Sequence, residues 1–524
     1  MPRMLPRGLS SVMLLGCASA ALVPAPSSRA LLNPAWSALR PRGAKMSAAV
    51  QLEDIKAAPP PALTPFSLAE AVSIQGFPEL PWRYALRNLV TDETFLEQGW
   101  ARRPFKLKQE WEFAVNAYTM GDVERDVSML PAQFVAHGMQ WGNGIYNKPM
   151  DAGFSFEDVS RTMSGATVVM LNAGFIVPSL AKVSLATLEA TRLPIWLNVY
   201  LTRPGLASST QLHTDKQDVL VVQTTGRKRW RVYAPPEPAE AAELDPFARG
   251  KGTDQMDASK LKLLVDTVMA PGQVLYIPAA FPHETDTVGE TVSEKESSVH
   301  LTIGIDTHLW GLSWAQARAT ALQRAGLPAS LSDGASVNCL PLDRWSSLHS
   351  PLPVGFAAAR YLSPLCHGDG GLSAARAEKA LCAAISDELA RRMAEAEPTR
   401  WGSAAAVLDA VPVSDVTKRM LEHHRAVLAQ QTRMYLRAAH SAPRSSRDRA
   451  AAQAALFEDM DELDLSMSQL DAWGRGAEAS QTPTAVAASP VGNSPAPAAK
   501  SGGFGAAAAP TRKAKGGKKK SKAR

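Results

Sequence analysis

Two short segments of this 524-residue chain carry side chains that could together hold a metal ion. In Gln211-Leu-His-Thr-Asp-Lys216, His213 and Asp215 are two residues apart, so on an extended chain both side chains project to the same side. In the second segment, a short apolar run followed by Phe281-Pro-His presents His283 from a proline-bounded loop. Two imidazoles and one carboxylate form the facial triad that leaves three positions open on a non-haem Fe(II). A lone histidine is more often a structural residue, so it is the combination that predicts an iron site.

A lysine that the pattern turns inward indicates an anionic ligand near this site. Residues 218–233 read as a β-hairpin that turns near Gly226. The second strand places Lys228, Trp230 and Val232 on one face and three arginines on the other, which is therefore the face that meets water. An unpaired buried ammonium is costly, and no acid in the hairpin obviously pairs with Lys228. A bound carboxylate would satisfy it.

Two further strands each have one polar and one aliphatic face. In residues 196–203 the polar face carries Asn198, Tyr200 and Thr202, and in residues 299–305 it carries His300 and Thr302. As a fourth ligand His300 would close the metal site, so we expect it in the wall of a pocket.

The stretch from about residue 194 to residue 314 closely resembles the JmjC-type double-stranded β-helix (cupin) oxygenases. The resemblance is most specific to their ribosomal-oxygenase branch, which contains histidyl and arginyl protein hydroxylases and lysine-demethylase-like enzymes. The matching pieces are Asn198-Val-Tyr-Leu-Thr-Arg-Pro-Gly205, His213-Thr-Asp215, Gly226-Arg-Lys-Arg-Trp-Arg-Val-Tyr233, Pro271-Gly-Gln-Val-Leu-Tyr-Ile-Pro278, Phe281-Pro-His283 and His300-Leu-Thr-Ile303. Upstream, residues 95–105 are similar to the family's pre-barrel helix.

The resemblance implies a ligand set and an activity. Fe(II) would be held by His213, Asp215 and His283, and 2-oxoglutarate would chelate the iron and reach Lys228 with its far carboxylate. The residues that would line the cosubstrate pocket are Asn198, Tyr200 and Thr302. With O2 as second cosubstrate, the enzyme would hydroxylate a side chain of a ribosomal or translation-related protein. It would release succinate and CO2. The alternatives are a histone lysine demethylase of the JmjC type and an inactive cupin used as a binding scaffold.

The elements around these residues predict an α+β fold in which a double-stranded β-helix core follows an N-terminal α/β lead-in and precedes a helical module. The predicted parts are a disordered targeting leader at 1–45, the lead-in at 60–195, the barrel core at 196–310, a helical dimerisation-like module at 311–441, a terminal helix at 445–475 and a disordered basic tail at 476–524. Residues 234–270 are expected to form a polar surface excursion. A terminal winged-helix domain, usual in the family, is not evident.

The charge of the chain is concentrated at its ends. The whole sequence carries +6, while residues 1–45 carry +6 and residues 511–524 carry +8, so residues 46–510 carry a net charge of −8. An acidic body does not suggest direct nucleic-acid binding by the core, although the basic tail is a candidate for RNA contact. No stretch reaches the roughly 18 apolar residues that span a bilayer, and four cysteines without a C-x-x-C pair exclude a disulfide scaffold.

The first 45 residues have the composition of a targeting sequence. A short apolar run with a small-residue cleavage pattern precedes an acid-free stretch rich in alanine, serine, proline and arginine, as in a signal followed by a transit peptide. This favours an organelle, a plastid, as the compartment, with the nucleus or nucleolus as the alternative. A protein substrate, a ribosomal protein or a histone, and a second copy of the chain as a homodimer are the expected partners.

Overall fold

The computed structural model describes residues 81–129, 139–142, 147–150, 154–236, 245–251, 254–289, 296–329, 348–359, 374–440 and 468–476. All of them belong to one compact unit, Met1–Ala479. The predicted leader at 1–45 and the predicted tail at 476–524, except Gly476 itself, lie outside the described residues. No helix in the described part of the chain is long and apolar enough to cross a bilayer.

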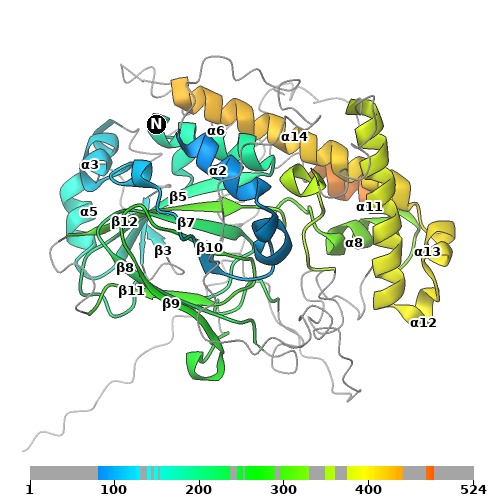
Figure 1. Ribbon diagram of the computed structural model, residues 1–524, viewed down its shortest axis with the longest axis horizontal. Helices are drawn as coiled ribbons and strands as arrows, with labels where there is room; N and C mark the ends of the chain where they lie inside the picture. The colour runs from blue at the N-terminus through cyan, green and yellow to red at the C-terminus, as the bar shows by residue number, and fades with distance from the viewer. Residues whose placement is uncertain are drawn as a thin grey trace, which may run out of the picture. The chain divides into compact units, whose positions relative to one another are not determined.

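Two antiparallel sheets form the centre of the fold (Figure 1). The larger sheet has the order β1-β10-β7-β12-β5-β4-β2-β3, and the smaller has the order β6-β11-β8-β9. The strands are β1 (Phe105–Lys106), β2 (Met139–Gly142), β3 (Asn147–Pro149), β4 (Thr167–Met170), β5 (Ile195–Thr202), β6 (Thr210–His213), β7 (Asp218–Thr225), β8 (Lys228–Tyr233), β9 (Leu263–Met269), β10 (Val274–Ile277), β11 (His283–Asp286) and β12 (Ser298–Ile305). From β5 to β12 the chain crosses from one sheet to the other at each step except between β8 and β9, which are neighbours in the smaller sheet. This is an eight-stranded jelly roll, and it confirms the predicted double-stranded β-helix core.

The predicted hairpin at residues 218–233 is wrong in one respect. The chain does turn at Gly226, but β7 pairs with β10 and β12 in the larger sheet, whereas β8 pairs with β11 and β9 in the smaller sheet. The turn is therefore a corner between two sheets. The predicted alternation in β8 is confirmed, because Lys228, Trp230 and Val232 are buried and the arginines between them are partly exposed.

The corner at Gly226 depends on the absence of a side chain. Its φ is +61°, and a Cβ there would lie 2.4 Å from the carbonyl oxygen of Ser297. We expect Gly226→Ala to lower the free energy of unfolding by about 2 kcal/mol or more, because backbone strain of about 1–3 kcal/mol adds to a clash with main-chain atoms. Gly289→Ala is the matched control, since Gly289 also has a positive φ (+102°) but has no atom within 4 Å of its Cβ position. Equal losses for the two variants in urea unfolding would contradict a steric role for Gly226.

The expected surface excursion is shorter than predicted. Residues 263–269 form β9, which pairs with β8 along its whole length. The described parts of the excursion before β9 are residues 234–236, 245–251 and 254–262. Phe247 in the second of these parts is buried and anchors it.

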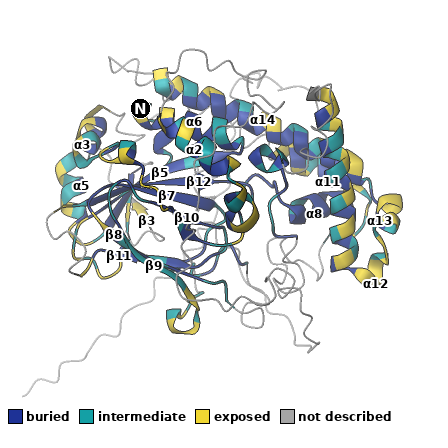
Figure 2. Ribbon diagram, in the orientation of Figure 1, coloured by how far each residue is buried: buried dark blue, intermediate teal, exposed yellow. Residues whose placement is uncertain are grey.

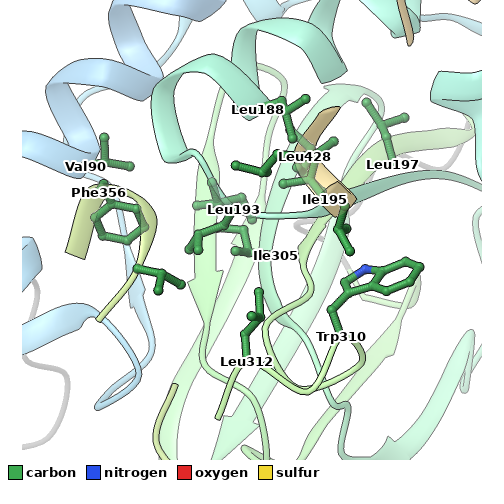
Figure 3. Close-up of a cluster of buried hydrophobic side chains, with 14 of the residues drawn as sticks. Val90, Leu188, Leu193, Ile195, Leu197, Ile305, Trp310, Leu312, Phe356 and Leu428 are labelled. Carbon is green, nitrogen blue, oxygen red and sulfur yellow. The ribbon is translucent and has the colours of Figure 1, made fainter. Parts of the chain in front are cut away.

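Helices cover one face of the larger sheet, and the main hydrophobic core lies between these helices and the sheet (Figures 2 and 3). These helices are α2 (Pro81–Thr91), α6 (Pro178–Thr191) and α14 (Val413–His440). The aliphatic face of β5, including Ile195 and Leu197, packs here with Leu188 of α6 and Leu428 of α14. The opposite face of β5 is left to line the space between the sheets. A smaller apolar cluster fills part of that space, and its buried members are Val219, Val221, Trp230, Val232, Met269, Leu275, Ile277 and Phe281.

The lead-in to the barrel contains two more helices, α3 (Met120–Met129) and α5 (Phe156–Thr162). The segment at residues 95–105, which resembles the family's pre-barrel helix, is helical only in a five-residue π turn at Phe95–Gly99 before it enters β1.

The helical module predicted at 311–441 is present in the described residues as α8 (Trp314–Arg324), α11 (Ala374–Ala396), α12 (Pro398–Trp401), α13 (Ala404–Ala410) and the long helix α14. Trp310 and Trp314 are core residues. Of the residues described in this module, Leu408 is the one large hydrophobic side chain that is exposed, so this part does not show the apolar face expected for a dimer. Of the predicted terminal helix at 445–475, residues 468–474 are helical, and residues 445–467 lie outside the described part.

Side chains on α14 fasten the helical module to the barrel. The Nε2 atoms of His423 and His424 lie 2.9 Å and 2.8 Å from the carbonyl oxygens of Trp310 and Arg192. Tyr435 donates a hydrogen bond of 2.6 Å to the carbonyl oxygen of Ile195, the first residue of β5. Both histidines are buried and act as structural residues.

Candidate metal centre

The three residues predicted to bind metal converge on one point. His213 is the last residue of β6 and His283 the first of β11, and the two are directly opposite each other in the paired strands. Oδ2 of Asp215 lies 3.4 Å from Nε2 of His213 and 3.6 Å from Nε2 of His283. One ligand atom from each residue lies within 4.8 Å of the other two, which is the spacing of a set of donors around a common ion.

The orientation of each imidazole is fixed by a hydrogen bond to the carbonyl oxygen of the residue two positions earlier. Nδ1 of His213 lies 2.8 Å from the carbonyl oxygen of Gln211, and Nδ1 of His283 lies 3.0 Å from that of Phe281. Because a carbonyl oxygen can only accept, each Nδ1 carries the proton and each Nε2 presents a lone pair. Such second contacts orient histidine ligands in metal proteins.

The charge state of the cluster suits a divalent cation. Burial alone would raise the pKa of Asp215, but the ammonium of Lys251 and the two histidines lower that pKa well below its ordinary value. Burial and the neighbouring His213 lower the pKa of His283 to about 4. One carboxylate and neutral imidazole donors are the ligands of mononuclear Fe(II) sites, so these residues fit the predicted metal.

Lys228 points into the barrel as predicted. It is fully buried, and its Nζ donates a hydrogen bond of 3.1 Å to Oγ1 of Thr202. Burial lowers the pKa of Lys228 to about 7, although the charge of Asp286 opposes this shift. Asp286 itself accepts a hydrogen bond from Arg231, and within the described part of the chain no carboxylate forms an ion pair with Lys228.

The other predicted pocket residues lie on adjoining strands of the larger sheet. Asn198 of β5 is opposite Thr302 of β12, and Tyr200 is opposite His300, on which its ring stacks at 5.0 Å. Oδ1 of Asn198 accepts a hydrogen bond of 2.9 Å from the backbone of Asn172. Oγ1 of Thr302 and Nδ1 of His300 are buried and have no hydrogen-bond partner among the described residues. Buried polar atoms are normally satisfied, so a polar ligand is expected beside them.

Trp230 connects the two halves of the site. Its ring centroid lies 6.2 Å from that of His283 and 5.3 Å from that of His300. Nζ of Lys228 lies 6.0 Å from the ring centroid of Tyr200. Ring contacts thus link His283 through Trp230 and His300 to Tyr200, beside which the ammonium of Lys228 lies.

Two contacts of the site, made by Thr202 and Lys251, were not predicted from the sequence. Thr202 lies on the predicted polar face of β5, and its contact with Lys228 could have been proposed from that alternation. Lys251, whose Nζ lies 2.9 Å from Oδ1 of Asp215, comes from the excursion, where no sequence pattern marks it.

Comparison with known proteins places a family domain over this site. Residues 183–310 match the JmjC domain family. A protein of Drosophila mojavensis named bifunctional lysine-specific demethylase and histidyl-hydroxylase NO66 is 27% identical over 231 residues, which are 42% of this chain and 24% of that protein. Its counterpart in Drosophila willistoni is 30% identical over 141 residues, 27% of this chain and 17% of that protein. The matched residues thus span a quarter or less of these two relatives.

Solved structures of the ribosomal oxygenase YcfD from Escherichia coli are also similar to this chain. One is 19% identical with a TM-score of 0.28 and covers 46% of this chain and 58% of that protein. Another, in complex with cobalt and 2-oxoglutarate, is 17% identical with a TM-score of 0.28 and covers 56% and 70%.

The domain match and the geometry coincide. Residues 183–310 contain β5 to β12, the three clustered donors and Lys228, which agrees with the family resemblance seen in the sequence. Residues 183–310 are thus similar to a JmjC domain, and within them His213, Asp215 and His283 form the candidate metal centre.

Proposed function

We propose that this chain is an Fe(II)- and 2-oxoglutarate-dependent dioxygenase that hydroxylates a protein side chain. The observation that carries the proposal is the convergence of His213, Asp215 and His283 inside a barrel that also buries the ammonium of Lys228 without a carboxylate partner among the described residues. A scaffold without catalytic activity would have no need to keep such a costly buried charge, which argues against an inactive cupin.

Different side chains of the site would bind the metal ion and the cosubstrate. Nε2 of each histidine and Oδ2 of Asp215 would hold the metal on one face and leave three positions for ligands. The ammonium of Lys228 would bind the far carboxylate of 2-oxoglutarate, and Asn198, Tyr200 and Thr302 would line the cosubstrate pocket. When bound, Fe(II) and 2-oxoglutarate would supply the chemistry that reduces O2, releases succinate and CO2, and places one oxygen atom on a substrate C–H bond. The apolar cluster around Trp230 would keep water from this chemistry.

For the substrate we propose a ribosomal or translation-related protein. The Drosophila relatives are named for histidyl hydroxylation and for lysine demethylation. Hydroxylation of an unmodified side chain is the reaction that we propose. Demethylation of a histone lysine is the second candidate, because the relatives' name gives lysine demethylation beside histidyl hydroxylation. Both reactions insert one oxygen atom, so the site itself serves either.

The test is to incubate the purified full-length chain with Fe(II), 2-oxoglutarate and ribosomal proteins, and in parallel with methylated histone peptides. We expect succinate release that is stimulated by ribosomal protein, together with a mass gain of one oxygen atom on a side chain. Loss of a methyl group from the histone peptides instead would support the demethylase, and absence of succinate under all conditions would refute the dioxygenase.

We further propose that residues 1–45 direct the chain to a plastid, that the basic tail contacts RNA, and that the chain forms a homodimer. The charge and composition of the termini support the first two proposals, and the family resemblance supports the third. A fluorescent protein fused to residues 1–50 tests the first proposal, and a nuclear signal would contradict it.

RNA affinity measured with and without residues 511–524 tests the second proposal, and an unchanged affinity would contradict it. Sedimentation of the full chain tests the third proposal, and a monomer would contradict it.

A further inference from the structure

The excursion between β8 and β9 folds back onto the residue between two of the metal ligands. Thr214 is fully buried between His213 and Asp215. Its backbone nitrogen donates to the carbonyl oxygen of Arg249 at 3.1 Å, and its hydroxyl accepts from the nitrogen of Arg249 at 2.9 Å. The same hydroxyl donates to the carbonyl oxygen of Pro246 at 2.7 Å. The excursion is therefore bonded to the metal-binding segment at three points.

A glycine allows the backbone of the excursion to approach this closely. Gly250 has a φ of +73°, and a Cβ there would lie 2.2 Å from the carbonyl oxygen of Leu212 and 2.9 Å from Cα of His213. Any other residue would push the excursion away from β6.

The excursion also has its own internal support. Oδ2 of Asp254 accepts hydrogen bonds of 2.8 Å from the backbone of Gly250 and from Nε of Arg249. Phe247 is buried and packs on His308 with ring centroids 4.3 Å apart. These contacts fix the turn before it reaches the metal centre, so the position of the next residue is defined.

Lys251, the residue after Gly250, contacts the carboxylate of Asp215, which faces both histidines. Its Nζ lies 2.9 Å from Oδ1 of Asp215, while Oδ2 of the same carboxylate faces the two imidazoles at 3.4 Å and 3.6 Å. The backbone carbonyl of Asp215 is held as well, by the nitrogen of Ala280 at 2.9 Å. One oxygen of Asp215 is thus engaged by the excursion and the other is presented to the metal position.

We propose that Lys251 is a positioning residue for the metal centre and holds Asp215 as a one-oxygen ligand. The inference rests on the metal centre of the proposed function and adds to it a part of the chain that lies outside the barrel strands. If both oxygens of Asp215 bound the ion, they would occupy one of the three positions that a facial triad leaves open. The ammonium on Oδ1 disfavours that arrangement, and the buried Thr214 and Gly250 contacts hold the ammonium in place.

The test measures binding of Co(II) alone to the full-length protein, by calorimetry and by the visible absorption of the bound ion. The variants are Lys251→Met, which keeps the length of the side chain and removes its charge, and Lys251→Arg, which keeps the charge. Lys260→Met is the matched control, because Lys260 is an exposed lysine of the same excursion. Circular dichroism of the metal-free proteins verifies that each variant is folded.

We expect Lys251→Met to raise the Kd for Co(II) about 10- to 100-fold, the usual effect of losing an outer contact to a ligand. Its visible absorption spectrum should also shift, because the second oxygen of Asp215 would replace the ligand at one of the open positions and so alter the ligand field of the ion. Lys251→Arg should stay within a few-fold of the wild type, and Lys260→Met should not differ from it. An unchanged Kd in Lys251→Met, or equal losses in the Met and Arg variants, would overturn the proposal.

These outcomes are separable from failure of the proposed function. A wild-type chain that binds Co(II) but never consumes 2-oxoglutarate would refute the dioxygenase and leave the role of Lys251 standing. A wild-type chain that binds no Co(II) would refute the metal centre and both proposals with it.

Discussion

Asp215→Ala is expected to abolish 2-oxoglutarate turnover and to weaken Co(II) binding by more than a hundredfold. Asp215 supplies the one carboxylate of the cluster, and its Oδ2 faces both imidazoles at less than 4 Å. Loss of an outer contact to a ligand costs roughly 10- to 100-fold in metal affinity or activity, so loss of the ligand itself should cost more. The variant also leaves the ammonium of Lys251 without the carboxylate that it contacts, which adds repulsion toward a cation.

Succinate release measures the turnover and calorimetry measures the metal affinity of this variant. Asp409→Ala is the control, because Asp409 is an exposed aspartate of the helix α13 and far along the chain from the barrel. We expect this control to match the wild type in both measurements. Turnover retained in Asp215→Ala would show that the ligand assignment is wrong.

Lys228→Met is expected to raise the Kd for 2-oxoglutarate roughly 30- to 5,000-fold in the Co(II)-loaded protein. Truncating one partner of a buried charge pair costs about 2–5 kcal/mol, and each 1.4 kcal/mol is about tenfold in affinity. Co(II) affinity without cosubstrate should stay close to that of the wild type, since Lys228 forms no contact with the three metal ligands in the described structure. An unchanged Kd for 2-oxoglutarate would refute the role of Lys228.

The same substitution should leave the ligand-free fold more stable at pH 7. The pKa of Lys228 is lowered to about 7 in the folded protein and is about 10.4 in an unfolded chain. Between these values the unfolded state binds more protons, so this lysine lowers stability near pH 7 and the loss disappears as the pH rises toward 10. Lys228→Met should therefore melt at a higher temperature than the wild type at pH 7, with a smaller difference at pH 9.5. A variant that is less stable at pH 7 would show that Lys228 is structural.

The metal ligands and the lysine could be predicted because each depends on local alternation. His213 and Asp215 share a side of an extended segment, and Lys228 shares a buried face with Trp230 and Val232. Side chains two residues apart lie on the same face of a strand, whichever strand pairs with it. The polar faces of β5 and β12 could be predicted for the same reason.

Pairing between strands could not be predicted in the same way. The alternation in residues 218–233 is the same for a hairpin and for a corner between two sheets, so only the structure separates β7 from β8. Strand β9 could not be predicted because it is an edge strand whose residues are mostly only partly buried, and the exposed Leu263 and Asp266 interrupt any apolar alternation. The contact of Lys251 with Asp215 joins residues 36 positions apart through an irregular segment, which no periodicity describes.

The pairing of β6 with β11 means that a bound metal ion would reduce local opening of these two strands. β6 is a four-residue strand at the edge of the smaller sheet, and its His213 lies opposite His283, about 70 residues further along the chain. A metal ion bound by both would act as a cross-link that closes this long loop, as a disulfide does in a secreted protein. Because an edge strand this short is prone to open locally, the ion should slow amide hydrogen exchange in β6 and β11 more than in β10. Loss of the bound ion should then make β6 and β11 more accessible to proteases.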